Sequence, residues 1–120
     1  DGLEAFLDRW LALPLFSGLP PVARALPERL TNRPEGLAAS LRRCGTGNQE
    51  PLWDRLGALA MPVLAVVGGE DAKFGAIAEE MAAIAPRLTI ARIPAAGHTA
   101  HLEQPDATID AVLRWLAVAG

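Results

Sequence analysis

The sequence has 120 residues, of which 51% are apolar, and its formal net charge is −3 at pH 7. This length suits at most one modest domain, and the apolar share is typical of a folded globular protein rather than a disordered one. The mildly acidic balance argues against partners such as nucleic acid or an anionic membrane, and no apolar run is long enough to span a bilayer.

The first half, residues 1–60, is predicted to be helical, with Pro- and Gly-rich breaks and no strand. One helix face collects apolar residues at the spacing of an amphipathic helix: Leu3, Phe6, Leu7, Trp10 and Leu11. After the break "SGLPP" we expect a short helix over 22–30. A third helix is predicted to begin at Pro34, with Asn32 as its N-cap, and to stop before "CGTGN". The stretch "PLWDRLGAL" predicts one more short helix.

The second half, residues 61–120, alternates strand and helix. The continuous apolar run "MPVLAVVGG" predicts a strand buried on both faces, and "RLTIARIP" a second, shorter strand. Helices are expected over "DAKFGAIAEEMAAIA" and from near Pro105 onward. The last helix has apolar residues on one side, namely Ile109, Val112, Leu113 and Leu116. This order is typical of a right-handed parallel β-α-β unit in an α/β fold.

Two parallel strands do not make a stable sheet, because their outer edges leave backbone groups unpaired. The missing strands must come from another chain or from sequence that precedes this one. The chain opens at Asp1, without an initiator methionine, and runs at once into a helical pattern. We therefore expect a piece of a longer protein, and we keep self-association through unpaired strand edges as an alternative.

Two ionisable residues follow the two predicted strands. Asp71 lies in the loop after the first strand, and His98 in the loop after the second. The carboxyl ends of parallel strands meet at one edge of a sheet, so these side chains are expected to lie together. A carboxylate beside a histidine can make it a general base. Taken singly, Asp71 could instead be a turn or helix cap, and His98 a solvated loop residue.

A nucleophile to accompany such a pair is not evident. Neither Ser17 nor Ser40 has the G-x-S-x-G setting of a hydrolase serine elbow. Cys44 is a single cysteine, which excludes an internal disulfide and favours a reducing, cytoplasmic setting; we interpret it as passive. His101 is interpreted as a surface or structural residue. No cluster with metal-ligand spacing is present, so no metal is expected.

Four stretches together resemble one branch of the α/β hydrolases. They are "FLDRWLALPLF", "NRPEGLAASLRRCGTGNQEPLW", "DAKF" and "AGHTAHLEQP". The last is shared with many α/β hydrolases, whereas the others are similar to the 2-succinyl-6-hydroxy-2,4-cyclohexadiene-1-carboxylate synthases of menaquinone biosynthesis. The resemblance implies the carboxyl-terminal part of an α/β-hydrolase fold: a helical cap over 1–60, then the last two parallel strands and their helices over 61–120.

The resemblance also implies a function. Such lyases need no cofactor and eliminate pyruvate from a carboxylate-bearing substrate, using a Ser-Asp-His triad. By position, Asp71 and His98 would be the triad acid and histidine. Trp10 would line the pocket and Arg29 would hold a substrate carboxylate, with Arg33 as its rival. The serine would lie before Asp1, in the amino-terminal half of the same enzyme, so we expect the isolated chain to be inactive.

Two alternatives to this lyase remain open. One is part of a true hydrolase, acting on an ester or a carbon–carbon bond with the same Asp71 and His98. The other is a non-catalytic, self-associating module in which both residues only cap helices. A pyruvate-release assay would separate the first alternative from the lyase, and the solution mass bears on the second.

Overall fold

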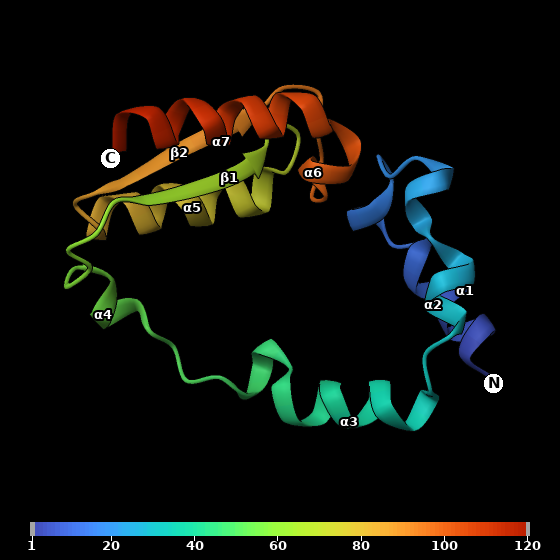
Figure 1. The fold of residues 1–120 in the computed structure, drawn as a ribbon. Coiled ribbons are helices and arrows are strands. Elements are labelled where there is room, and N and C mark those ends of the chain that lie inside the picture. Colours follow the sequence, from blue (N-terminus) through green and yellow to red (C-terminus); the bar gives the residue numbers. More distant parts are fainter. Residues whose placement is uncertain (1, 120) are drawn as a thin grey trace.

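A computed structural model describes residues 2–119 of the chain. Its elements, in chain order, are α1 (Leu3–Leu11), the 3₁₀ turns η1 (Pro14–Phe16) and η2 (Pro21–Arg24), α2 (Leu26–Leu30), α3 (Pro34–Cys44), η3 (Thr46–Asn48), α4 (Trp53–Leu56), β1 (Val63–Gly68), α5 (Ala72–Ile84), β2 (Leu88–Ile93), α6 (Ala100–Glu103) and α7 (Pro105–Ala119). The first half is helical, and strands alternate with helices in the second half (Figure 1).

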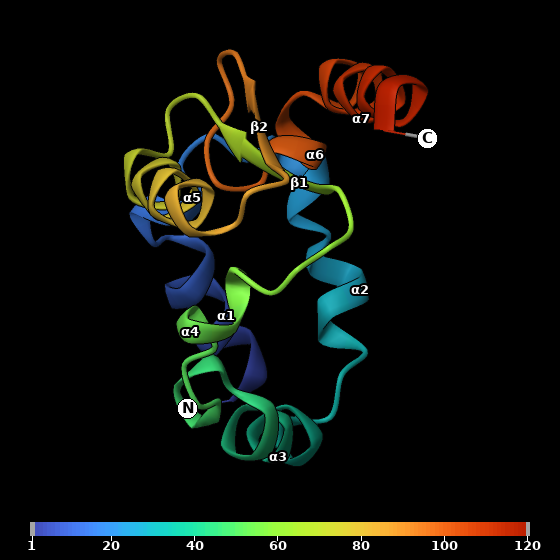
Figure 2. The same cartoon turned by 90° about the vertical axis from the view of Figure 1, so that its left-hand side faces the viewer.

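The second half forms a small three-layer unit. Strands β1 and β2 pair in parallel, in a register that runs from Val63 opposite Leu88 to Gly68 opposite Ile93. Helix α5 covers one face of this pair and α7 covers the other (Figure 2). The predicted β-α-β unit with a following helix is therefore confirmed, and it forms because the crossover helix packs back on the strands that it joins.

The expected complete burial of the first strand is wrong for this chain. In β1 only Val67 and Gly68 are buried, while 63–66 are half-buried. The sheet of the described residues has two strands, so one edge of β1 has no neighbouring strand beside it. A strand made only of apolar residues is unusual at the exposed edge of a sheet, because edge strands normally carry charged residues or proline that prevent pairing with another strand.

The apolar face predicted for α7 is not the face that packs on the sheet. Ile109, Leu113 and Leu116 are each more than half exposed. Instead the small residues Ala107 and Ala111 pack against a buried cluster that lies at the end of β2: Ile93, Ala96 and Ala100. Short side chains let the helix approach the sheet closely, and the larger ones are left facing outward.

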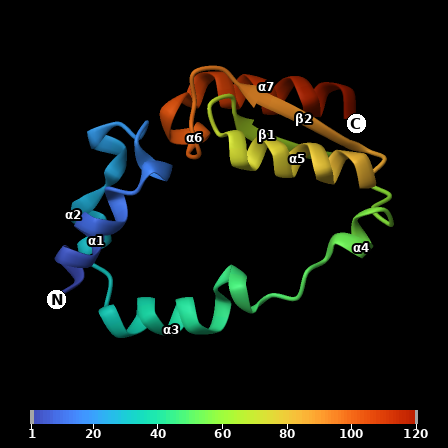
Figure 3. The same cartoon turned by 180° about the vertical axis from the view of Figure 1, so that it is seen from behind.

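The helical half has its own small core, formed where α1 packs against α2. The buried apolar residues of this half are Leu7 and Leu11 on α1, and Phe16 and Leu19 in the segment that follows it. Helix α3 lies on the opposite side of the molecule from the sheet (Figure 3). None of the helices within residues 2–119 is long and apolar enough to cross a membrane.

Two local predictions in this half are wrong. The helix expected over 22–30 is broken at Ala25, which has a left-handed backbone (φ 47°). Pro27 accounts for the break, because a proline is tolerated in the first turn of a helix but not in its interior. Asn32 does not cap α3: its Nδ2 donates to the Arg29 carbonyl at the end of α2, and Arg33 takes the cap position.

Candidate active site

The loops that follow β1 and β2 are held together by backbone contacts. The Gly69 N–H donates to the Ile93 carbonyl (2.8 Å), and the Glu70 N–H donates to the Ala96 carbonyl (2.9 Å). Gly68 makes the approach possible, since a Cβ at this position would overlap the carbonyl oxygens of Ala96 and Gly97. The chain thus requires glycine at residue 68 to bring the two loops into contact.

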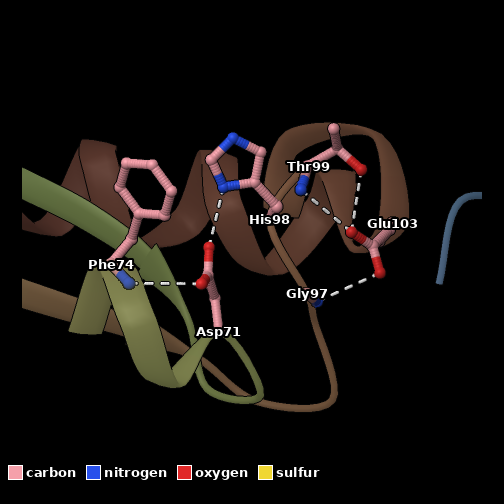
Figure 4. Close-up of polar contacts among 6 residues, drawn as sticks. All are labelled: Asp71, Phe74, Gly97, His98, Thr99 and Glu103. Atoms are coloured by element: carbon pink, nitrogen blue, oxygen red, sulfur yellow. Dashed lines mark hydrogen bonds and ion pairs between the residues drawn. The ribbon is translucent and has the colours of Figure 1, made fainter. Parts of the chain in front are cut away.

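Asp71 uses its two carboxylate oxygens for two different purposes. Oδ1 accepts a hydrogen bond from the Phe74 N–H (3.2 Å), which makes Asp71 the N-cap of α5. Oδ2 lies 2.8 Å from Nδ1 of His98 (Figure 4). Capping and pairing with a histidine were alternatives at the level of sequence, yet one carboxylate does both. The cap fixes the carboxylate, so its second oxygen has a defined direction.

The His98 ring is held on one side and open on the other. Phe74 packs against it, with ring centroids 4.4 Å apart and the planes tilted by 46°. The Asp71 side chain is 9% exposed and that of His98 is 29% exposed. A carboxylate at Nδ1 favours the tautomer that carries its proton there, which leaves the Nε2 lone pair available. Within residues 2–119, Nε2 has no hydrogen-bond partner.

The pair borders a cavity of ≈ 370 Å³ between the strand-end loops and the segment that follows α1. Its lining includes Pro14, Ser17, Gly18 and Glu103. Ser17 borders this cavity, but no hydrogen bond joins it to His98. A second cavity, of ≈ 160 Å³, runs along β1 and is also lined by Asp71 and His98. The histidine therefore faces the side of the sheet where β1 has no neighbouring strand.

Trp10 and Arg29 form a second pair. The Arg29 guanidinium lies 5.1 Å from the centre of the Trp10 ring, in a cation–π arrangement, and its Nε donates to the Arg24 carbonyl (2.7 Å). Both residues line a cavity of ≈ 400 Å³ that is largely apolar. Arg33 does not line it. The structure thus brings Trp10 to Arg29 and Asp71 to His98, but the two pairs do not share one cavity.

The remaining candidates take no part in either pair. Cys44 is exposed at the end of α3, and His101 is exposed, as its interpretation as a surface residue predicts. In the described part of the chain no three His, Cys, Asp or Glu side chains are placed to hold a metal ion.

Two residues that contact the Asp71–His98 pair or its loop were not predicted from the sequence. Phe74 falls within the helix predicted over "DAKFGAIAEEMAAIA", but its ring contacts His98 and its N–H donates to Asp71. Glu103 accepts hydrogen bonds from the loop that carries His98. A capping box would have a glutamate three residues after the N-cap residue, whereas Glu103 comes four residues after Thr99, so that rule does not find it.

Comparison with known proteins identifies the family of the chain. The Alpha/beta hydrolase family matches residues 1–111, so the chain belongs to the α/β hydrolase family. Within it, the chain is similar to a putative 2-succinyl-6-hydroxy-2,4-cyclohexadiene-1-carboxylate synthase of Bacillus subtilis, with 44% identity over 110 residues. The synthase of Salmonella newport is 38% identical over 115 residues.

A solved structure, that of MenH from S. aureus, superposes with a TM-score of 0.90 at 36% sequence identity. The match covers 97% of this chain and 46% of the solved one. Likewise 88% of this chain covers 40% of the Bacillus relative, and 94% covers 43% of the Salmonella relative. The chain thus spans less than half the length of these relatives and corresponds to their carboxyl-terminal part, as the resemblance implied.

Proposed function

We propose that this chain is the carboxyl-terminal part of a lyase that eliminates pyruvate from a succinyl-cyclohexene-carboxylate substrate, as in menaquinone biosynthesis. The observation that carries the proposal is the 2.8 Å contact between Asp71 Oδ2 and His98 Nδ1 at the carboxyl end of a parallel sheet. The 44% identity to the Bacillus synthase supports the choice of reaction.

In this proposal His98 works through a serine that is not in the chain. Asp71 holds the proton of the ring on Nδ1, and Nε2 accepts the proton of the serine hydroxyl. The serine oxygen then removes a proton from the substrate. The electron pair of that C–H bond becomes a ring double bond as the C–O bond to the leaving group breaks. Pyruvate leaves as its enolate, which takes up the proton held by His98. No metal or cofactor is needed, because the histidine and serine together supply the base.

The substrate of this reaction is anionic, and the helical half offers a cation for it. Arg29 borders an apolar cavity and is stacked on Trp10, which holds the guanidinium in place while its remaining N–H groups stay available. Such a planar fork pairs with a carboxylate through two hydrogen bonds. We assign residues 1–60 to a cap and Arg29 to substrate binding on this basis.

The partner in this proposal is the amino-terminal half of the same enzyme. Two surfaces of the chain support it: the bare edge of β1 and the exposed stripe of Ile109, Leu113 and Leu116 on α7. Fully burying an apolar side chain of this size stabilises a protein by about 1.5–3 kcal/mol. These surfaces would be covered by the strands and helices of the preceding half, with self-association of the chain as the competing outcome.

The test compares the 120-residue chain, the preceding polypeptide and the two together. We expect pyruvate release from the combination and none from the chain alone, because His98 has no hydroxyl to activate. Ester substrates are assayed in parallel. Ester hydrolysis without pyruvate release would identify a true hydrolase, and turnover by the chain alone would overturn the triad.

A further inference from the structure

We propose that Glu103 is a positioning residue that holds the His98 loop, so that the imidazole stays on Asp71. The inference rests on the proposed function, in which His98 acts as the base. It concerns a carboxylate that makes no contact with the imidazole and acts only through the backbone on either side of it.

Glu103 binds both neighbours of His98 in the sequence. Its Oε1 accepts from the Gly97 N–H (3.0 Å), and its Oε2 accepts from the Thr99 N–H (3.0 Å) and the Thr99 hydroxyl (2.8 Å). These bonds enclose the loop from one side, while Asp71 and Phe74 hold the ring from the other (Figure 4). Hydrogen bonds to a carboxylate are stronger than those between neutral groups. These three bonds, which we call the Glu103 clamp, therefore restrict the backbone on both sides of His98.

Glu103 lies on a short helix that hydrogen bonds hold in place. Helix α6 starts directly after the loop, and the N–H groups of Leu102 and Glu103 both donate to the Thr99 carbonyl (2.8 and 3.0 Å). The Thr108 hydroxyl donates to the Ala100 carbonyl (3.1 Å), which ties α6 to α7. Ala100 belongs to the buried cluster at the end of β2. Glu103 therefore connects the histidine loop to the most buried part of the sheet unit.

A segment from the helical half closes over the same carboxylate. Gly18 lies so near Glu103 that a Cβ at residue 18 would overlap Oε1. The close approach brings the backbone of the turn after α1 against the half-buried Glu103 carboxylate. It also makes Glu103 the point at which the turn after α1 meets the histidine loop.

The first experiment observes the ring directly in the ¹⁵N-labelled 120-residue chain, bound to the unlabelled polypeptide that precedes it. The chain has two histidines, and exposed His101 serves as the internal reference. Long-range ¹⁵N–¹H spectra report the imidazole tautomers, and amide exchange reports the Gly97 and Thr99 N–H groups. We expect one His98 tautomer, protonated at Nδ1. Glu103→Gln should produce a tautomer mixture for His98 alone and speed exchange of the two amides by at least about tenfold.

Further variants separate positioning from general loss of structure. Gly18→Ala displaces the carboxylate without removing it and should change the His98 signals in the same direction, whereas Gly47→Ala adds a Cβ that meets nothing within 4 Å and should not. Thr99→Val removes only the hydroxyl bond and should give a smaller change. Glu80→Gln, at an exposed glutamate on α5, controls for the lost charge. If Glu103→Gln unfolds the chain, the His98 signals of Gly18→Ala and Thr99→Val still test whether Glu103 positions the imidazole.

The outcomes for Glu103 and for the proposed function can be told apart. Unchanged His98 tautomers in Glu103→Gln, with faster exchange at Gly97 and Thr99, would make Glu103 a simple turn-former and overturn the inference. Unchanged tautomers in both Gly18→Ala and Thr99→Val would do the same. Failure of the complete enzyme to release pyruvate, with the spectra as expected, would count against the proposed reaction and leave the role of Glu103 intact.

Discussion

His98 Nδ1 and Asp71 Oδ2 lie 2.8 Å apart although their residues are 27 positions apart in the chain. The contact exists because parallel pairing puts the ends of β1 and β2 at one edge and Gly68 lets the following loops touch. The same carboxylate caps α5, so its position is determined by the helix as well as by the histidine.

Replacing Asp71 by Asn separates these two uses of the carboxylate. Asparagine is as good an N-cap as aspartate, so the free energy of unfolding should change by less than about 1 kcal/mol. The amide no longer holds His98 in the required tautomer, and pyruvate release by the complete enzyme should fall by about 10³-fold or more. Steady-state kinetics and chemical denaturation measure the two effects. A variant within tenfold of the unchanged enzyme would exclude Asp71 from the triad.

Replacing Gly68 by Ala tests the close approach of the loops. The added Cβ meets the backbone carbonyls of Ala96 and Gly97, which cannot rotate away, so the strand ends must separate. We expect a loss of about 1–3 kcal/mol in the free energy of unfolding. The matched control is Gly47→Ala, whose Cβ has open space. Equal stability of the two variants would mean that the loops adjust freely.

Replacing Arg29 by Lys tests the assignment of a carboxylate site. Lysine keeps the charge but loses the planar fork and the stacking on Trp10. The KM of the complete enzyme for its substrate should rise about tenfold or more, because one charge-assisted hydrogen bond is lost. Arg33→Lys provides the comparison, since Arg33 does not line the cavity of Trp10 and Arg29. The opposite pattern of KM values would move the site to Arg33.

Replacing Leu113 by Lys tests the exposed stripe of α7. A charge in the middle of a surface that another polypeptide buries should weaken the complementation of this chain by its amino-terminal half by about tenfold or more. Val118→Lys is the control, because Val118 is 82% exposed and lies on the other side of the helix. Titration of pyruvate release against the concentration of the chain measures the complementation of each variant. Equal concentrations at half-maximal activity would rule out the stripe as the interface.

Much of the α/β half could be predicted from the sequence. Apolar runs ended by glycine define two strands, helical periodicity defines the crossover, and strand order then brings residues 71 and 98 to one edge. Hydrophobic spacing predicts the strands and helices because it depends only on residues near one another in the chain. The meeting of residues 71 and 98 follows because parallel strands place their carboxyl ends at the same edge of the sheet. The division at residues 60 and 61 into cap and core stays a prediction, as do the roles of Trp10 and Arg29.

Other features depend on how distant parts of the chain meet. Sequence periodicity marks an apolar face on α7, but only packing decides that Ala107 and Ala111 lie on the sheet while Leu113 faces outward. The contact of Glu103 with the His98 loop and Gly18 is likewise a matter of backbone path. Local patterns determine which elements form, because propensity and hydrophobic spacing act over one or two turns. Their mutual placement is decided only by close packing of the whole chain, in which small residues set how near two backbones can come.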